Sequence, residues 1–413
     1  MLKISFDGLE EQEKSIFLDI ACFLQGKSKD YIMDFLDACR FDSVIGIQIL
    51  IERSLVSIEY GVIQMHDLLQ QMGWEIIRQE SIREPGQRSR LWSTDDVLYL
   101  LSNSLGTNAV EGIVIDLLGP EEVHLGDNAF ANMTSLRLLV MHGAHFSGTP
   151  LRLPSGLRWI ELAGCSLPSL EFNFGLKKLK VVNLRGSNIK SLGAGFQNFK
   201  HLKSINFADC ERLIEIPDFS TVENLETLIF SGCNALTKVH ESVGFLLKLV
   251  TLDLHSCSNL SSFPSIIKLR SLETFALSGC TKLKTFPCVG ENMPCLSDLC
   301  LEKSGIEELP SSLEHLVNLE AIFLDGCKNL TCLPTSMYKM HCPRLLYMSN
   351  CSKLGKFPEL IEDVDSICLP YRCSLLRSAS LGELVLRNCN LRDVDNLLAP
   401  QSFTTLRGLD LLK

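Results

Sequence analysis

The sequence lacks the segments that would send it out of the cell or across a membrane. Residues 1–9 read MLKISFDGL, in which Lys3 and Asp7 interrupt the apolar stretch that a secretory signal requires. No apolar run among the 413 residues approaches the roughly 20 residues that span a bilayer. We therefore expect a cytoplasmic protein, with the nucleus as a second compartment, in which the thiols are mostly reduced.

The sequence also lacks an excess of positive charge and a pattern of metal ligands. It has 39 Lys and Arg residues against 49 Asp and Glu residues, a formal net charge of −10, which argues against nucleic acid as the main partner. Its 17 cysteines form no C-x-x-C pair and are joined by no histidines at ligand spacing, so we expect no metal site. No nucleophile–base pair stands out either, and we expect a protein that is not an enzyme.

What the sequence does contain is an internal repeat. From residue 136 onward the pattern L-x-x-L-x-L-x-x-C-x-x-L recurs, mostly at steps of 21 to 25 residues. A degenerate copy occupies 344–358, and the long step that follows it predicts an insertion near 359–380. The first leucines of the other copies are Leu136, Leu157, Leu179, Leu202, Leu225, Leu249, Leu272, Leu296, Leu319, Leu381 and Leu406.

The repeat predicts a leucine-rich-repeat horseshoe solenoid. The L-x-L centre alternates with period two, so each copy supplies a short strand with one buried face, and the strands stack into a curved parallel sheet. A proline ends the strand-bearing half of many copies, because proline cannot donate to a ladder. These prolines are Pro217, Pro264, Pro287, Pro310, Pro334 and Pro358.

Many of the cysteines recur at one position of the repeat, and we call this set the cysteine column. They share a position that turns inward after the strand, where a small side chain can meet turn amides. Adjacent members could approach disulfide distance, but we favour free buried thiols, since buried cysteine behaves as a small hydrophobe. The members are Cys165, Cys210, Cys233, Cys257, Cys280, Cys327, Cys351 and Cys389.

The first 135 residues have no repeat and predict a mainly helical domain with a β-hairpin. Apolar residues at helical spacing over 10–24 end at Gly26, and Ser28 can cap a second helix. Residues 54–65 read as two short strands around Glu59–Gly61, and Asp67 can cap the helix that follows. Helices followed by a hairpin wing predict a winged-helix domain. A DNA-reading winged helix should carry Lys and Arg on its recognition helix, whereas residues 30–39 are acidic.

A linker segment follows this domain. Residues 84–86 read Glu-Pro-Gly, which predicts a turn, and Ser93 with Asp96 forms a capping box before a short helix. Ile113, Ile115 and Leu117 then alternate as a strand that could cap the open end of the solenoid.

Five segments together resemble plant intracellular nucleotide-binding leucine-rich-repeat (NLR) disease resistance receptors of the TIR class. They are FLDIACFLQG (17–26), QMHDLLQQMGWEIIRQES (64–81), EPGQRSRLW (84–92), GTNAVEGIVIDL (106–117) and AFANMTSLRLL (129–139). The resemblance implies a winged-helix subdomain of the nucleotide-binding module over 1–82 and a linker with the solenoid cap over 83–135. It assigns 136–413 to about 12 repeats.

The resemblance also implies a nucleotide-sensing role for Met65, His66 and Asp67. In such receptors this motif places its histidine against the β-phosphate of bound ADP, and a ring N–H is a suitable donor to phosphate. Without the resemblance, a lone histidine before a helix cap reads as a surface residue. The sequence contains no G-x-x-x-x-G-K-[ST] loop and no TIR domain, so we expect a C-terminal fragment that does not bind ADP or ATP tightly by itself.

The concave face of the sheet is the predicted recognition surface. The residue between the two strand leucines faces it, and the later repeats place aromatic residues there. The alternative is that Phe323 and Tyr347 only pack on each other. The residues we single out are Asp253, Asp298, Phe323, Asp325 and Tyr347.

The predicted function is therefore that of a plant innate-immunity receptor fragment. Its repeats would recognise a pathogen effector or a guarded host protein and contact the receptor's own nucleotide-binding module for autoinhibition, with defence signalling as the output. A leucine-rich-repeat substrate adaptor or scaffold without nucleotide function is the alternative. An extracellular repeat receptor would need a signal peptide and Asn rather than Cys in the ladder.

Overall fold

The structure is a computed structural model, and the residues that it describes fall into two compact units. It describes residues 2–117, 122–125, 128–147, 153–166, 176–192, 199–339, 345–355, 383–385 and 408–410. The units are Met1–Ser187 and Asn188–Lys413. Within the described residues, no helix is both long enough and apolar enough to cross a bilayer.

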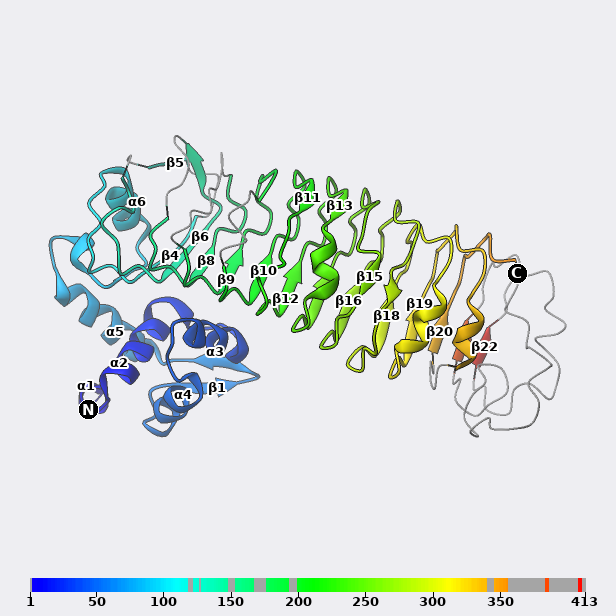
Figure 1. The fold of residues 1–413 in the computed structure, drawn as a ribbon. Helices are drawn as coiled ribbons and strands as arrows, with labels where there is room; N and C mark the ends of the chain where they lie inside the picture. Colours follow the sequence, from blue (N-terminus) through cyan, green and yellow to red (C-terminus); the bar gives the residue numbers. More distant parts are fainter. Residues whose placement is uncertain are drawn as a thin grey trace. The chain divides into compact units, whose positions relative to one another are not determined.

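The N-terminal unit opens with helices and one β-hairpin (Figure 1). Strands β1 and β2 pair antiparallel, and Tyr60 and Gly61 between them both have positive φ, as a tight two-residue hairpin turn requires. The winged-helix prediction is confirmed, hairpin included. The elements are α1 (Leu2–Asp7), α2 (Glu11–Asp19), the π-helix η1 (Ile20–Leu24), α3 (Lys29–Ala38), α4 (Ser43–Glu52), β1 (Ser57–Glu59), β2 (Val62–Gln64) and α5 (Asp67–Glu80).

Side-chain caps fix where these helices begin. Ser28 Oγ accepts the backbone N–H of Tyr31 at the start of α3, as predicted, and Asp42 Oδ1 accepts that of Ile45 at the start of α4. The start of α5 differs from the prediction, because His66 rather than Asp67 is the capping residue.

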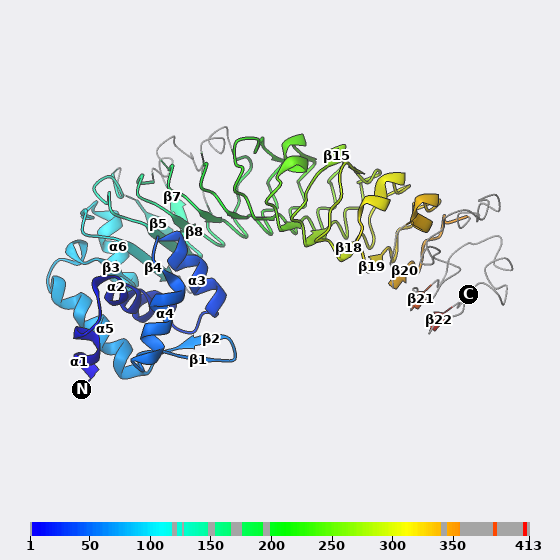
Figure 2. The same cartoon turned by 60° about the horizontal axis from the view of Figure 1, so that its bottom comes forward.

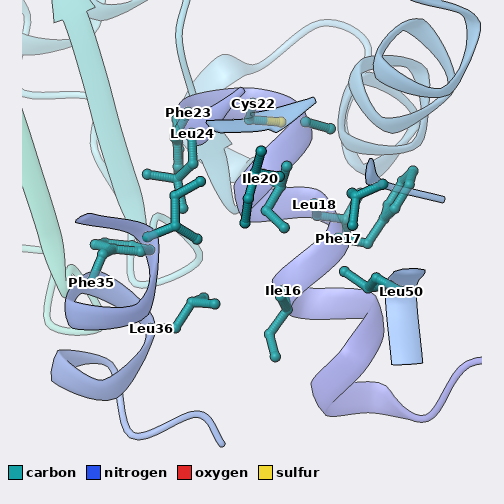
Figure 3. Packing of buried hydrophobic residues seen from close by; sticks show 14 of the residues in the cluster. Ile16, Phe17, Leu18, Ile20, Cys22, Phe23, Leu24, Phe35, Leu36 and Leu50 are labelled. Carbon is teal, nitrogen blue, oxygen red and sulfur yellow. The ribbon is translucent and has the colours of Figure 1, made fainter. Parts of the chain in front are cut away.

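The core of the helical domain lies between α2, η1, α3 and α4. Ile16, Ile20, Leu36 and Leu50 are fully buried there, and Figure 3 shows them in one cluster. Gly73 of α5 lies so close to η1 that an added Cβ would stand 2.6 Å from the Cβ of Ala21. A larger residue at this position would push α5 away from η1.

The linker adds an edge to the repeat sheet. Ser93 Oγ accepts the N–H of Asp96 at the start of α6, which is one half of the predicted capping box, and the Asp96 carboxylate accepts from Arg88 Nη1 at 3.0 Å. Strand β4 pairs in parallel with β6 on one side and with β3 on the other. The expectation that 113–117 cap the sheet is therefore wrong, since β3 lies outside β4. The linker elements are the 3-10 helix η2 (Pro85–Gln87), β3 (Arg90–Leu91), α6 (Thr94–Ser102) and β4 (Gly112–Asp116).

The first repeats complete the N-terminal unit. Their strands continue the parallel sheet in the order β4, β6, β8 and β9, and a second pair, β5 with β7, forms a separate small sheet. The bounds are β5 (Glu122–His124), β6 (Leu138–His142), β7 (His145–Ser147), β8 (Trp159–Glu161) and β9 (Val181–Asn183).

The second unit is built of further repeats with one sheet strand each. These strands pair in parallel and in register, so that Leu228 lies beside Leu252 and Leu252 beside Phe275 (Figures 1 and 2). The sheet strands are β10 (Ser204–Asn206), β12 (Thr227–Ile229), β14 (Thr251–Asp253), β16 (Thr274–Ala276), β18 (Asp298–Cys300), β19 (Ala321–Phe323), β20 (Leu345–Tyr347), β21 (Glu383–Val385) and β22 (Gly408–Asp410).

Short elements form the returning half of these repeats. Two-residue strands pair with one another there, β11 with β13 and β15 with β17, and 3-10 helices of five residues add to this half, η4 just after β13 in the same repeat. They are β11 (Glu215–Ile216), β13 (Lys238–Val239), η4 (Glu241–Phe245), β15 (Ile266–Ile267), β17 (Cys288–Val289), η5 (Ser311–His315) and η6 (Thr335–Lys339). The leucine-rich-repeat prediction is confirmed; the expected insertion near 359–380 and Pro358 lie outside the described residues.

The turn after each sheet strand is left-handed in every repeat described. The residue at this turn has positive φ, and it is glycine in six of the ten cases. It comes directly before the small, inward-turned residue of the cysteine column. The ten residues are Gly143, Gly164, Gly186, Asp209, Gly232, Ser256, Gly279, Lys303, Gly326 and Asn350.

The described cysteines of the column are free and buried, as expected. Their thiols donate to backbone carbonyls of the preceding repeat, for example Cys233 Sγ to Phe207 O at 3.1 Å and Cys257 Sγ to Phe230 O at 3.1 Å. Burial raises the pKa of Cys233 and of Cys280 to about 12, so these thiols stay protonated. Cys389 lies outside the described residues.

Candidate functional site

The predicted nucleotide-sensing residues lie between β2 and α5. Met65 is buried, and its carbonyl accepts a hydrogen bond from Gln25 Nε2 at 3.2 Å. His66 and Asp67 are exposed. The ring of His66 caps α5, since its Nδ1 accepts the backbone N–H of Leu68 at 3.1 Å. Asp67 is the first residue of the helix, where a negative charge favours the helix dipole.

This cap determines which ring nitrogen of His66 can donate. Because Nδ1 accepts a hydrogen bond, a neutral ring must carry its proton on Nε2. The exposed ring therefore offers one N–H donor outward. One N–H donor of this kind can reach a single anionic oxygen of a ligand.

A buried ionic network joins the helical domain to the linker and the first repeat. Asp19, at the end of α2, is fully buried and accepts from Arg90 Nε at 2.7 Å and from Arg137 Nη2 at 2.8 Å. Arg90 also donates to Ser15 Oγ at 2.7 Å, and Arg137 donates to Cys39 Sγ at 3.0 Å. Three segments far apart in the sequence thus meet at one carboxylate.

The charges of this network support one another. Burial alone would lower the pKa of Arg137, but the carboxylate of Asp19 outweighs that effect and holds the pKa above its ordinary value. Two guanidinium groups share one buried carboxylate, and Glu111, at 3.5 Å from Arg137, supplies a second, half-exposed negative charge. Sequence reasoning missed this network, because no local pattern relates residues 19, 90 and 137.

A second contact holds α3 against the concave side of the first repeats. Glu161 of β8 accepts from Tyr31 Oη at 2.9 Å, Asn183 Nδ2 at 3.1 Å, His142 Nε2 at 3.2 Å and Trp159 Nε1 at 3.4 Å. Burial alone would raise the pKa of Glu161, but the hydrogen bonds from His142 and Tyr31 hold it below its ordinary value. Glu161 therefore stays ionised at the centre of this contact.

The aromatic rings of α3 complete the contact. Tyr31 and Phe35 meet Trp159 edge-on, with ring centroids 5.2 Å and 5.7 Å apart. Lys180 Nζ donates to the carbonyl oxygen of Asp37 at 2.7 Å. Glu161 thus binds α3 of the same chain, and Asn183 supports it through a hydrogen bond to the Glu161 carboxylate.

The concave face of the second unit carries the predicted recognition residues. The last residue of each strand faces this side, and these residues are in turn Ile229, Asp253, Ala276, Cys300, Phe323 and Tyr347. The rings of Phe323 and Tyr347 stack, with centroids 5.3 Å apart and planes 6° from parallel. They do pack on each other, as the alternative proposed, and both remain half-buried.

A groove of about 780 Å³ lies on this concave face. Asp253 and Asp325 line it, whereas Asp298, Phe323 and Tyr347 do not. It is also lined by residues that sequence reasoning did not single out, among them His255, Glu302 and Lys303. His255 and Glu302 lie in the turns that follow β14 and β18, two residues before the position of the cysteine column, and their recurrence at one repeat position is the signal that could have found them.

The groove carboxylates are held in place by hydrogen bonds. Asp253 Oδ1 accepts the backbone N–H of His255 at 2.9 Å. Asp325 Oδ1 accepts the backbone N–H of Ser349, and Glu302 Oε2 accepts the hydroxyl of Ser278. A carboxylate has about four acceptor positions, so each of these groups is oriented and can still accept from a ligand.

Comparison with known proteins agrees with the two parts of this fold. A family model described as the winged-helix domain of Roq1-like disease resistance proteins matches residues 10–81, and a BspA-type leucine-rich-repeat model matches residues 151–246 in 6 copies. TMV resistance protein N of Nicotiana glutinosa is 36% identical over 89% of this chain and 32% of its own length. Disease resistance protein RPP2B of Arabidopsis thaliana is 31% identical over 99% of this chain and 37% of its own length.

Other matches follow the same pattern. Disease resistance protein RUN1 of Vitis rotundifolia is 38% identical over 60% of this chain and 21% of its own length. The chain thus spans between a fifth and somewhat more than a third of these relatives. Among solved structures, a TDR receptor matches with a TM-score of 0.48 at 17% identity, covering 81% of this chain and 60% of that one.

Proposed function

Since this chain belongs to the plant disease resistance proteins of the TIR–NBS–LRR class, we propose that it is the sensing part of such a receptor. The repeats of the second unit bind a protein, either a pathogen effector or a guarded host protein. The observation that carries the proposal is the groove of about 780 Å³ on their concave face, with oriented carboxylates at Asp253, Glu302 and Asp325.

The test of this role is resistance in the plant. Plants that express the gene product carrying this chain are challenged with a pathogen isolate that it recognises. Asp253→Arg combined with Asp325→Arg should abolish the response, because both substitutions fill the groove and reverse its charge. The matched pair Glu211→Arg and Glu215→Arg lies outside the groove lining and should leave resistance intact. Resistance that survives the groove pair would refute the proposal.

The helical domain is the part that passes the signal on. The Asp19 network and the Glu161 contact bind it to the first repeats within one compact unit. The domain and these repeats would then move together when the repeats bind a partner. In the resting receptor the same unit contacts the receptor's own nucleotide-binding module.

His66 supplies a nucleotide contact in this scheme. Its Nε2–H would donate to a phosphate oxygen of ADP, and the cap on α5 orients the ring for this role. One donor does not hold a nucleotide, and the sequence contains no phosphate-binding glycine loop. The chain alone should therefore show no ADP binding at micromolar concentrations in calorimetric titration. A dissociation constant of micromolar or lower would contradict this part of the proposal.

The remaining features accord with a binding protein that works in the cytoplasm. The cysteine column consists of free thiols, which a reducing compartment maintains. We propose no catalytic step for this chain, and no nucleic-acid partner, because the net charge of −10 disfavours phosphate binding. A scaffold without a nucleotide switch would share the groove, and it would differ in keeping full function after His66→Ala.

A further inference from the structure

The concave face around Cys300 has carboxylates on both sides of an apolar strip. Asp298 lies in β18 two residues before Cys300, so period-two alternation turns both side chains to one face, and Glu302, in the turn after the strand, lines the same groove as Cys300. Asp325 holds the position of Glu302 in the next repeat, beside Phe323. Asp298 and Glu302 thus lie on opposite sides of Cys300 along the chain, and the carboxylates form two borders of a strip.

These carboxylates differ from others in the same unit by having no cationic partner. Within the described residues, Asp253, Asp298, Glu302 and Asp325 make no salt bridge. Elsewhere in the unit carboxylates do pair with cations, as Lys203 with Glu226, Arg270 with Glu291 and Lys284 with Glu307. Lys303 and the exposed His255 are the basic residues of the groove lining, so the lining carries a net negative charge.

The strip itself is apolar and ends at the aromatic pair. Ala276, Cys300 and Phe323 follow one another across adjacent strands, and Tyr347 stacks on one face of Phe323 at the strand spacing. On the side away from Tyr347, Phe323 has Cys300 as its register partner on β18. A planar cation lying over Cys300 would meet this side of Phe323 and the bordering carboxylates together.

We propose that this strip binds an extended, arginine-bearing segment of a protein partner. A guanidinium group combines a flat face, which stacks on an aromatic ring, with a fork of donors that matches carboxylates in pairs, and lysine offers only the charge. Acidic peptides and nucleic acid would be repelled here. A metal ion is not the occupant, since no three His, Cys, Asp or Glu side chains in the described part of the chain could hold one.

This inference rests on the proposed function and makes it more specific. The probe is a phage-displayed library of random ten-residue peptides, selected on the full chain at low salt. The variant called the groove variant is Asp298→Asn, Glu302→Gln and Asp325→Asn together, in which Glu302 and Asp325 line the groove and Asp298 borders the strip. The matched control is Glu211→Gln, Glu215→Gln and Glu308→Gln, which removes the same charge from exposed positions outside the groove. Circular dichroism establishes that both variants are folded.

The expected result is enrichment of arginine over lysine, glutamate and aspartate in peptides selected by the wild-type chain. A selected peptide should bind the groove variant about tenfold more weakly or worse, as expected when oriented charge partners are removed, and bind the control unchanged. Raising the salt concentration should weaken binding to the wild type. Phe323→Leu should weaken the binding of an arginine peptide more than the binding of the same peptide with lysine in place of arginine.

The two proposals fail in different ways. Peptides without arginine enrichment that still depend on the groove would overturn the arginine inference and leave a protein-binding groove. Peptides that bind both variants equally, or no selected peptide at all, would overturn the inference as well. The proposed function fails separately, when the groove substitutions leave pathogen resistance intact.

Discussion

Replacing Asp19 by Asn should strongly destabilise the N-terminal unit, because it removes the negative charge that two buried guanidinium groups share. Asn keeps the size of the side chain and removes only the charge that Arg90 and Arg137 share. Breaking a buried ion pair by removing one partner costs about 3–5 kcal/mol. A domain is stable by only about 5–15 kcal/mol, so the loss is a large part of the total.

Tryptophan fluorescence reports on this unit alone. The chain has three tryptophans, Trp74, Trp92 and Trp159, and all lie in Met1–Ser187. In a unit of this size each kcal/mol shifts the midpoint of thermal unfolding by roughly 2–4 °C. Asp19→Asn should therefore lower the midpoint followed by fluorescence by about 10 °C.

The control is the same chemical change at an exposed site. Asp95→Asn lies in the first turn of α6 and should cost no more than about 0.5 kcal/mol. If the unfolding midpoint of Asp19→Asn equals that of Asp95→Asn within experimental error, the network does not hold the helical domain to the first repeats, and the reasoning is wrong.

Three further changes probe other parts of the structure. The hydrogen bond from His142 to Glu161 raises the pKa of His142. The contribution of protonated His142 to stability is therefore fully present below pH about 6.5 and is lost as pH rises through the folded pKa. His142→Gln should remove this pH dependence from thermal midpoints measured across pH 5.5–8.5. Gly279→Ala should destabilise the second unit by about 1–2 kcal/mol in urea unfolding, because its φ is +79° and the new Cβ would stand 3.1 Å from Ser256 Cα; an unchanged midpoint would show that the turn relaxes. His66→Ala should cost about 1 kcal/mol by removing the cap of α5, whereas His66→Asn should keep most of it, and equal loss in both would argue against the cap.

The regular parts of the fold follow from the sequence because they arise from local periodicity. The L-x-L centres predict strands whose alternate residues are buried, and Leu228 and Leu252 lie where that pattern puts them. The cysteine column is predictable for the same reason, since each copy repeats one turn. The two-residue turn at Tyr60 and Gly61 follows from its residue types.

The contacts between distant segments do not follow from the sequence. Asp19 is 118 residues from Arg137, and nothing near either residue signals their pairing. The repeat pattern predicts Glu161 as an exposed residue of the concave face. Tyr31 covers it instead, because α3 packs on the first repeats. The prediction for Asp67 was wrong because aspartate caps helices more often than histidine, while the backbone here places His66 at the cap.

The central claim is that the groove of the second unit binds a protein partner, and a photo-crosslink tests it most directly. A photoreactive amino acid at Ala276, in the groove lining, is compared with one at Glu308, outside it, in the full gene product in challenged leaf tissue. The account predicts a partner-derived, arginine-containing peptide attached at position 276 and not at position 308. A partner attached at position 308 and absent from position 276 would contradict it.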